Sequence, residues 1–399
     1  GLALGEHAYA GALRFFATGS LEEEPLAGPI VRRYLESALL TAFATRRLLR
    51  ALRFSSTVVT HGIYVPWGII AEVSRQEHVR VSTWNVAYRK RRFIFSHDNT
   101  YHHTLMSEPR EHWENLELSE QQDRDLMHYL SSRREGLFDW IVFHRPKTDD
   151  PKELPSLLGL DPSKPVIGLL TNVSWDAQLH YPANAFNSML DWLVQTCRYF
   201  ERRPDLQLLI RVHPAEISGF PPSGQPVLGE LHKVLPQLAP NIIVVPPESE
   251  LSTYALMSLC NSVIIYGTKT GVELTSRGIP VIVAGEAWIR NKGLTCDASS
   301  PEEYFRILDG LPFVSRLDAG MVARARRYAY HFFFNRMIPL PFIEPHAGNS
   351  IYRLKLNSVR HLLPGESAGL DTICNGIIGR TPFVLGDSTS SRPSELVSP

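Results

Sequence analysis

The loop at residues 267–273, which reads Gly-Thr-Lys-Thr-Gly-Val-Glu, offers the most obvious chemistry in the sequence. It lies between an apolar run and a helical pattern, where free backbone N–H groups can hold a phosphate at the start of a helix. Thr268, Lys269 and Thr270 would add donors and positive charge, and Glu273 could reach a ribose diol. The alternative is a glycine-rich turn in which Glu273 only complements the helix dipole. The spacing is neither that of the P-loop nor G-x-G-x-x-G, so both interpretations stay open.

Two further groups of polar residues each follow an apolar run. Arg211 and His213 come at the end of one run, and Pro214 fixes the turn after them. His213 could donate a hydrogen bond to a phosphate or to a leaving-group oxygen, or it could simply cap the end of a strand. Asn172 and Asp176 lie in a polar loop after another run, where the alternative is an Asx turn that opens the next helix.

The elements that must position these residues alternate between strands and helices. Continuous apolar runs separated by helical patterns predict a parallel sheet that is covered by helices on both faces. Ligands bind outside the carboxyl ends of the strands in such sheets, so the polar residues above would share one edge. The predicted strands lie at residues 166–170, 206–212, 242–245, 262–266 and 280–284, with a helix over 186–200 between the first two.

The first part of the chain also has an α/β pattern. A long amphipathic helix is expected within the first 55 residues, and the β-branched run at residues 57–60 predicts a strand that ends at His61 and Gly62. Further strands are expected at residues 78–83 and 92–96. A cluster of histidines follows the last of these strands.

The chain is expected to divide near residue 150. Prolines and charged residues between 143 and 164 have the composition of a linker. This pattern predicts a boundary between an N-terminal α/β domain at residues 1–150 and a second α/β domain at residues 151–320, which contains the candidate phosphate loop. An aromatic helix near the end needs a surface to bury against, so residues 321–362 are expected to return towards the first domain. Residues 363–399 are expected to form a tail, disordered at its end.

Composition excludes several classes of protein. The chain has 399 residues, and its 41 basic residues balance its 41 acidic residues, so no net field would attract a nucleic acid. Its four cysteines form no C-x-x-C pair, which excludes that zinc or redox motif and favours a reducing cytoplasm. The apolar runs are only as long as strands, so no helix is expected to cross a membrane.

Four segments together resemble the capsule and surface polysaccharide biosynthesis family of GT-B glycosyltransferases. The resemblance covers about residues 160–300 and the final aromatic helix, and it is weak over the first domain. It implies an α/β fold of two Rossmann-like domains with parallel sheets facing a cleft, with a C-terminal helix that crosses back to the first domain. The four segments are residues 171–176 (Thr-Asn-Val-Ser-Trp-Asp), 211–216 (Arg-Val-His-Pro-Ala-Glu), 266–273 (Tyr-Gly-Thr-Lys-Thr-Gly-Val-Glu) and 292–297 (Lys-Gly-Leu-Thr-Cys-Asp).

The resemblance also implies substrates and residue roles. His213 and residues 268–271, which include Gly271, would contact the phosphates of a nucleotide-sugar donor, and Glu273 would contact its ribose. The donor would be a substrate, and no cofactor or metal is expected. The acceptor would be a growing capsular, lipopolysaccharide or lipid-linked glycan. The enzyme would then work in the cytoplasm, with at most peripheral association with the inner face of the cytoplasmic membrane.

One departure from the family bears on the mechanism. Retaining members of the fold carry a glutamate eight residues before the ribose glutamate, and Ile265 stands at that position here. An inverting transfer is therefore favoured, and it needs a general base in the first domain. His61 is the candidate base because it ends the clearest strand there and because Gly62 would let a substrate approach. The alternative is a structural histidine at a strand end.

A second candidate for the base is the cluster at residues 97–103. His97, Asp98, His102 and His103 fall within seven residues of one another. Three imidazoles and a carboxylate could also bind a metal ion, and the other interpretation is a surface loop.

Three other functions are compatible with the same architecture. Sugar-nucleotide 2-epimerases share it, although residues 266–273 lack the paired acidic ending expected of them. CDP-alcohol phosphotransferases of teichoic-acid type also use a His-Pro turn and a hydroxyl-rich loop. A non-catalytic GT-B scaffold is the third alternative. It would not need polar residues at four separate strand ends.

Overall fold

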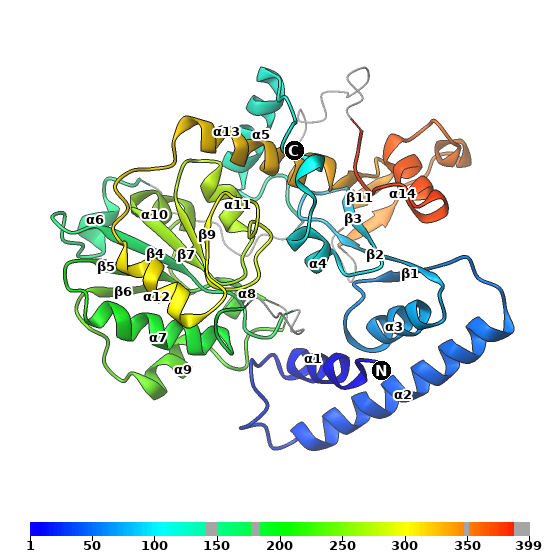
Figure 1. The fold of residues 1–399 in the computed structure, drawn as a ribbon, viewed down its shortest axis with the longest axis horizontal. Coiled ribbons are helices and arrows are strands. Elements are labelled where there is room, and N and C mark those ends of the chain that lie inside the picture. Colours follow the sequence, from blue (N-terminus) through cyan, green and yellow to red (C-terminus); the bar gives the residue numbers. More distant parts are fainter. Residues whose placement is uncertain (134, 141–149, 177–183, 220, 347–350, 387–399) are drawn as a thin grey trace. The chain divides into compact units, whose positions relative to one another are not determined.

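A computed structural model describes residues 1–133, 135–140, 150–176, 184–219, 221–346 and 351–386. The chain forms two compact units (Figure 1). Unit 1 consists of Gly1–Ala12, Glu22–Val142 and Tyr328–Pro399, and unit 2 consists of Leu13–Leu21 and Phe143–Arg327. Within the described residues, no helix is both long enough and apolar enough to cross a membrane.

Unit 2 is built on a parallel sheet of six strands, as the sequence predicts for this part of the chain. The strands lie in the order β6-β5-β4-β7-β8-β9, and every neighbouring pair is parallel. Counted along the chain, this is the order 3-2-1-4-5-6 of a Rossmann fold, which reverses direction between β4 and β7. The bounds are β4 (Val166–Leu170), β5 (Gln207–Arg211), β6 (Ile242–Val245), β7 (Ser262–Ile265), β8 (Val281–Val283) and β9 (Cys296–Asp297).

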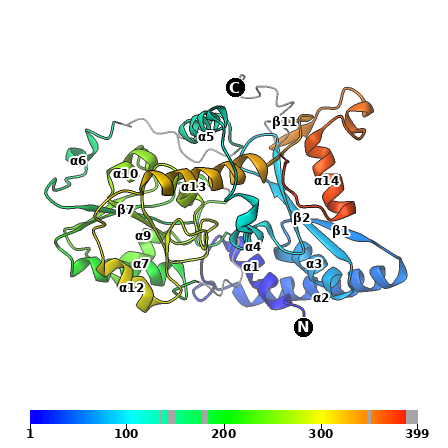
Figure 2. The same ribbon diagram turned by 45° about the horizontal axis from the view of Figure 1, so that its top comes forward.

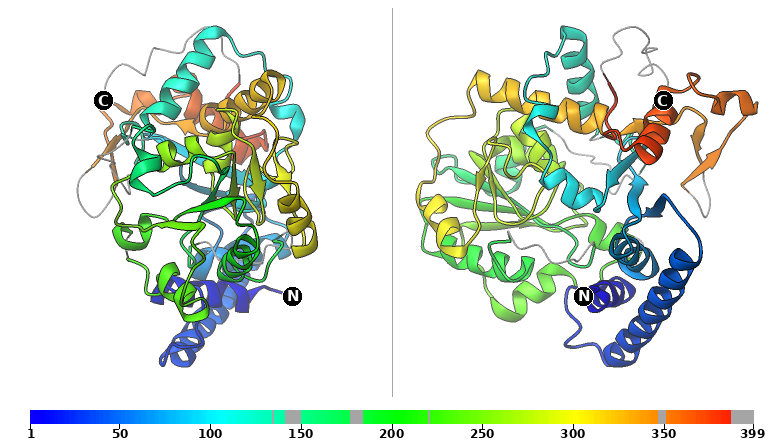
Figure 3. Two further views of the ribbon diagram at one scale, coloured as in Figure 1. Left: turned by 90° about the vertical axis from the view of Figure 1, so that its left-hand side faces the viewer. Right: turned by 45° about the vertical axis from the view of Figure 1, so that its right-hand side comes forward.

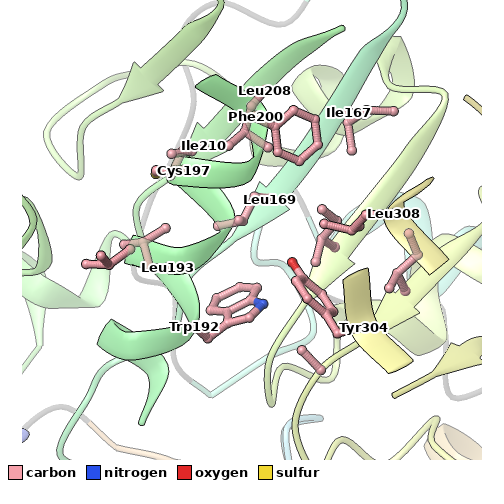
Figure 4. Close-up of a cluster of buried hydrophobic side chains, with 14 of the residues drawn as sticks. Ile167, Leu169, Trp192, Leu193, Cys197, Phe200, Leu208, Ile210, Tyr304 and Leu308 are labelled. Atoms are coloured by element: carbon pink, nitrogen blue, oxygen red, sulfur yellow. The ribbon is translucent and has the colours of Figure 1, made fainter. Parts of the chain in front are cut away.

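One face of this sheet packs against α7 (Met189–Glu201), α9 (Val227–Val234) and α12 (Pro301–Asp309) (Figure 4). The side chains of Trp192, Phe200 and Tyr304 are fully buried there. Tyr304 keeps its polar end satisfied, because its hydroxyl lies 2.8 Å from Thr196 Oγ1. Alternate strand residues such as Ile167 and Leu169 supply the other side of this core, which fits the period of two in a strand.

Helices α10 (Thr253–Leu259) and α11 (Thr270–Thr275) also belong to unit 2. Gly168 of β4 permits a close approach to α10, because a Cβ atom there would lie 2.7 Å from Met257 Sδ. Two short helices, α6 (Leu154–Leu157) and α8 (Ala215–Ser218), complete the described helices that lie wholly in unit 2.

Unit 1 contains a mixed sheet in the order β1-β2-β3-β10. Strands β1 and β2 are parallel, and the expectation of a parallel sheet holds in this unit only for that pair. Strand β3 pairs antiparallel with β2 because residues 87–91 alone connect them, which is too few for a crossover. The bounds are β1 (Ser56–Thr60), β2 (Arg80–Val86), β3 (Arg92–His97) and β10 (Ile338–Pro339).

The helical segment before β1 is not continuous. It consists of α1 (Leu4–Phe16) and α2 (Ala27–Ala51), since Gly19, Ser20 and Pro25 fall between them and interrupt the helical pattern. Helix α2 is one unbroken helix, drawn in blue (Figure 3). The other helical elements of unit 1 before the linker are η1 (Tyr64–Gly68), α3 (Ile69–Gln76), α4 (Tyr101–Met106), η2 (Arg110–His112) and α5 (Glu120–Ser132).

The chain returns to unit 1 through α13 (Ala319–Tyr330), drawn in gold, and a π-helical turn, η3 (His331–Asn335) (Figure 2). The expected surface for its aromatic residues exists. Tyr328 packs on Trp113 at 5.1 Å between ring centroids, and Phe333 packs on Tyr129 at 5.0 Å.

The segment expected to be a tail is largely ordered up to residue 386. It contains α14 (Ala368–Gly379), whose Gly376 lies against the ring of Phe383. The sequence does not predict this helix, because glycine, serine and threonine are frequent there. The disorder predicted at the end of the chain falls on residues 387–399, outside the described residues. The remaining elements of unit 1 are β11 (Ile343–Pro345), β12 (Tyr352–Leu354) and η4 (Val359–Leu362).

Candidate functional site

The strand order of unit 2 reverses between β4 and β7, and polar residues follow both strands. Asn172 follows β4 and Gly267 follows β7. A Cβ atom on Gly267 would lie 3.8 Å from Asn172 Nδ2, so the two loops are in contact. Asn172 Oδ1 is buried and accepts no hydrogen bond from the described residues. A buried acceptor without a donor is costly, and at this point of a Rossmann fold it suggests a ligand that brings one.

His213 follows β5 and is tied to the end of β4. Its backbone N–H donates to Thr171 Oγ1 at 3.0 Å, and its Nδ1 accepts the N–H of Ala215 at 3.1 Å. Because a backbone N–H can only donate, the proton of the neutral ring must lie on Nε2. Burial, followed by the charges of Lys269 and Arg211, lowers the pKa of His213 to about 4. At neutral pH His213 is therefore an uncharged hydrogen-bond donor in a positive field.

Lys269 and Glu273 form an ion pair inside the predicted phosphate loop. Lys269 Nζ lies 3.0 Å from Glu273 Oε1, and Glu273 Oε2 accepts the hydroxyl of Tyr254 at 2.6 Å. The Glu273 side chain is completely buried, so it does not present a carboxylate to a ribose in this structure. Nothing in the sequence marks Tyr254, 19 residues before Glu273, as the partner of this carboxylate.

The two threonines of this loop organise the start of α11. Thr268 Oγ1 accepts the N–H of Thr270 at 3.3 Å and lies 3.1 Å from the Thr270 hydroxyl. Helix α11 has only six residues, so a helix dipole contributes less than the sequence suggested. Gly271 also serves packing, because a Cβ atom there would lie 2.7 Å from Ile265 Cδ1 and 2.9 Å from Ile289 Cγ2. It is buried against apolar side chains and is not open to a phosphate.

The structure places two other predicted site residues in structural contacts. Arg211 is buried, and its guanidinium donates to the carbonyl oxygens of Pro246 and of Ser249, the latter at 3.2 Å. Burial lowers its pKa to about 10. Asp176 forms a partly exposed ion pair with Arg14 at 2.8 Å. Arg211 therefore holds the loop after β6, and Asp176 holds the segment that contains Arg14.

The loop after β8 contains a second buried arginine, Arg290, which no motif in the sequence marks. It donates to the carbonyl oxygens of Gly285 at 3.2 Å and Ala298 at 2.9 Å, and to Ser299 Oγ at 2.7 Å. Lys292, two residues later, is also buried. These residues fix the loop that borders β7 and β8 on the carboxyl side of the sheet.

His61 of unit 1 is held in a defined tautomer. The Oδ1 atom of Asn85 accepts the N–H of Val86 at 2.8 Å, so its Nδ2 faces His61 Nε2, 3.0 Å away. An amide Nδ2 can only donate, and the neutral ring must therefore carry its proton on Nδ1. The lone pair that a general base needs at Nε2 is thus already in use. No motif in the sequence marks Asn85, although its position directly after the parallel part of β2 matches that of His61 after β1.

The rings around His61 come from two short helical elements. Its ring is stacked on His102 at 6.2 Å between centroids and lies 5.8 Å from Tyr64 and 6.0 Å from Tyr101. Burial, followed by the charges of His61 and His103, lowers the pKa of His102 well below its usual value.

The second candidate cluster is divided: His102 is stacked on His61, whereas His97 and Asp98 make other contacts. His97 Nε2 donates to the carbonyl oxygen of Thr381 at 2.8 Å, and its ring is stacked on Phe383 at 4.3 Å. Asp98 pairs with Arg380 at 2.6 Å. His97 ends β3 and Asp98 follows it. Strand β3 runs antiparallel to β2, so both residues lie towards the opposite end of the sheet from His61. Among the described residues, no three His, Cys, Asp or Glu side chains are grouped as a metal site.

A pH dependence follows from the lowered pKa of His213. The unfolded chain takes up a proton at this residue near pH 6.5, whereas the folded chain does so only near pH 4. The contribution of His213 to the free energy of unfolding is therefore fully present above pH 6.5. As the pH drops towards 4, the free energy of unfolding falls by at least about 1 kcal/mol. Thermal unfolding of the wild type and of His213→Gln across this range measures the effect. Parallel curves for the two proteins would contradict the assignment.

Comparisons with known proteins found similarity only among solved structures. No family model and no curated protein matches the sequence. The structure is similar to the beta Kdo 2,4 transferase KpsC of Thermosulfurimonas dismutans, with a TM-score of 0.45, 12% identity, and coverage of 69% of this chain and 79% of that chain. It is also similar to the UDP-GlcNAc 2-epimerase of Neisseria meningitidis, with a TM-score of 0.34, 12% identity and coverage of 74% and 76%. A third is the Methanocaldococcus jannaschii UDP-GlcNAc 2-epimerase, with a TM-score of 0.35, 10% identity and coverage of 82% and 94%.

Proposed function

We propose that this protein is a glycosyltransferase that takes its sugar from a nucleotide-activated donor, which unit 2 binds where the strand order reverses. The buried Asn172 Oδ1, which lacks a donor among the described residues, carries the proposal. It follows β4, and His213 and Lys269 follow the strands on either side of β4. A nucleotide sugar offers what these residues need, since its hydroxyl or base N–H groups can donate to Asn172 and its diphosphate is an anion.

The proposed residues would act on the leaving group. In the transfer, the bond between the anomeric carbon and the phosphate oxygen breaks, and a bond to the acceptor oxygen forms. The nucleoside diphosphate gains charge as it leaves, and the Nε2–H of His213 and the ammonium of Lys269 would stabilise that charge. The acceptor hydroxyl loses its proton to a base. No step in this scheme requires a metal ion.

The acceptor that we propose is a growing capsular or surface glycan, and the transfer that we propose is inverting. The first proposal rests on the sequence resemblance at residues 171–176, 211–216, 266–273 and 292–297, and the second rests on Ile265. The roles proposed for Arg211, Asp176 and Gly271 change in view of their contacts. They would support the donor site from behind and would not touch the donor.

Nucleotide binding tests the proposal directly. We expect at least one of UDP, GDP, CMP, CDP or TDP to raise the unfolding temperature. We expect Asn172→Leu to weaken the binding of that nucleotide about tenfold, because one good hydrogen bond is lost. The same substitution should leave the ligand-free protein as stable as the wild type, because it removes a buried acceptor that has no donor among the described residues.

The matched control is Glu201→Ala, at the exposed end of α7. This substitution should change neither the nucleotide affinity nor the stability of the ligand-free protein. If no nucleotide shifts the unfolding temperature, the proposed function is wrong. If Asn172→Leu binds as well as the wild type, the site lies elsewhere. Incubation with the identified nucleotide sugar then separates the reaction classes, because an epimerase alters the sugar without an acceptor, whereas a transferase needs one.

The tautomer of His61 leads to a separate prediction. We expect Asn85→Asp to reverse the hydrogen bond, because a carboxylate accepts from Nε2–H and favours the charged ring. The pKa of His61 should therefore be higher in Asn85→Asp than in the wild type. Nuclear magnetic resonance of protein labelled with ¹⁵N-histidine reports both the tautomer and the pKa, and His61→Gln identifies the signal.

Asn357→Asp, at an exposed position of the same unit, adds the same charge as a control. It should leave the His61 signal unchanged. A wild-type spectrum with the proton on Nε2 would show that Asn85 does not set the tautomer and would restore His61 as a base acting through Nδ1. An unchanged proton position in Asn85→Asp would contradict the assigned hydrogen bond.

A further inference from the structure

Helix α2 has one face that packs against the rest of unit 1 and another that is apolar and exposed. Ala38 and Ala42 on the inner face are buried against residues of α3. On the outer face, Leu40 is 71% exposed and Phe43 is 69% exposed, and Leu39 beside them is 46% exposed. Large side chains at neighbouring positions of one helix face form a patch, and such patches usually mark an interaction surface.

Arginines lie on both sides of this patch. Arg33, Leu40 and Arg47 are spaced seven residues apart, about two helical turns, so they lie in one stripe. Arg32 pairs with Glu36, and Arg46 and Arg50 both pair with Glu77. Arg33 and Arg47 are exposed, and within the described residues neither has an ion pair or hydrogen bond. The outer face therefore combines an apolar centre with available positive charge, in a chain whose formal net charge is zero.

We propose that the outer face of α2 docks on an anionic lipid surface. Leu39, Leu40 and Phe43 would enter the boundary between headgroups and acyl chains, and Arg33 and Arg47 would contact lipid phosphates. The helix lies on the surface and does not span it, because five of its 25 residues are arginines. This inference goes beyond the proposed transfer reaction and does not depend on it.

A second copy of this chain fits the same face poorly. Two α2 helices that packed antiparallel around Leu40 would place Arg33 of each copy opposite Arg47 of the other. A parallel arrangement would place each arginine opposite itself. Like charges that face each other across an interface oppose association, and the one carboxylate within α2, Glu36, already pairs with Arg32. An anionic surface satisfies both arginines at once.

Sedimentation of the full chain with vesicles tests the proposal. The chain should bind vesicles that contain phosphatidylglycerol and should not bind vesicles of phosphatidylcholine alone, and the binding should weaken as salt is raised. We expect Leu40→Ser combined with Phe43→Ser to weaken the partition at least about tenfold. Arg33→Ala combined with Arg47→Ala should weaken it by a similar factor, since each arginine near an anionic surface is worth about fivefold.

The matched control combines Val359→Ser with Arg360→Ala in unit 1. Val359 is 78% exposed and Arg360 beside it is also exposed, so the control removes an apolar and a basic side chain from another surface. Circular dichroism should show an unchanged fold for all variants, because every substituted side chain is exposed. The proposal is overturned if the wild type does not bind anionic vesicles or if the α2 variants bind them as strongly as the wild type. It is also overturned if the control variant loses as much vesicle binding as the α2 variants. It is also overturned if the wild type is a dimer that Leu40→Ser with Phe43→Ser converts to a monomer.

Discussion

Replacing Glu273 with alanine is expected to lower the free energy of unfolding by about 3 kcal/mol, the lower end of the range for breaking a buried ion pair. The substitution removes a fully buried carboxylate that pairs with Lys269 at 3.0 Å and accepts the Tyr254 hydroxyl at 2.6 Å. Both partners would be left in a largely buried site without their acceptor. Thermal or urea unfolding of the ligand-free protein measures the loss.

Glu273→Gln is the informative companion, because its amide oxygen can still accept from Tyr254 while the charge is gone. We expect it to lose less stability than the alanine variant. A ribose contact predicts a different outcome, in which Glu273→Ala weakens nucleotide binding and leaves the unfolding temperature of the ligand-free protein unchanged. That outcome would return Glu273 to the role that the sequence suggested.

The second large effect is expected on the rate of transfer when His213 is replaced by alanine. The Nε2–H of this residue would face charge that grows on the leaving diphosphate, and removal of one such donor costs roughly 10² to 10³ in kcat. Donor binding should weaken by a smaller factor, because the charge is larger in the transition state than in the bound donor. Measurements of turnover and of donor affinity, made with the nucleotide sugar found by thermal shift, separate the effect on the rate from the effect on donor binding.

Two conservative variants sharpen this test. The side-chain amide of His213→Gln reaches the position of Nε2 and should retain part of the rate, whereas that of His213→Asn reaches only the position of Nδ1 and should not. Equal rates for both variants would show that His213 does not act through Nε2. A loss of stability as large as the loss of rate would instead mark a structural residue.

The sequence predicts unit 2 better than unit 1 for a physical reason. Strands β4, β5 and β7 are buried on both faces, so they are continuous apolar runs that stand out against the helices between them. Unit 1 mixes parallel and antiparallel pairs, and its last helix, α14, is rich in glycine. Local composition does not reveal such a helix, because its position is fixed by packing against residues distant in sequence.

The candidate site shows the same limit at the level of single residues. The sequence places Asn172, His213 and Lys269 at strand ends on one edge of a sheet, and they lie there. It cannot show which polar groups are already engaged. Arg211 is engaged by carbonyl oxygens that lie 35 and 38 residues away, and Asp176 by an arginine 162 residues away. Partners at such separations leave no trace in spacing, so the sequence overstates the number of side chains available to a ligand.

Arg211 and Arg290, which are both buried in unit 2, have a consequence for the entropy of binding. Arg211 holds the backbone of the loop after β6, and Arg290 holds that of the loop after β8. Ordering a loop when a ligand arrives costs conformational entropy, and binding then weakens by that amount. Here hydrogen bonds within the protein already restrain both loops. The entropy lost on binding would therefore come largely from the ligand itself, which favours rigid ligands over flexible ones of equal contact area.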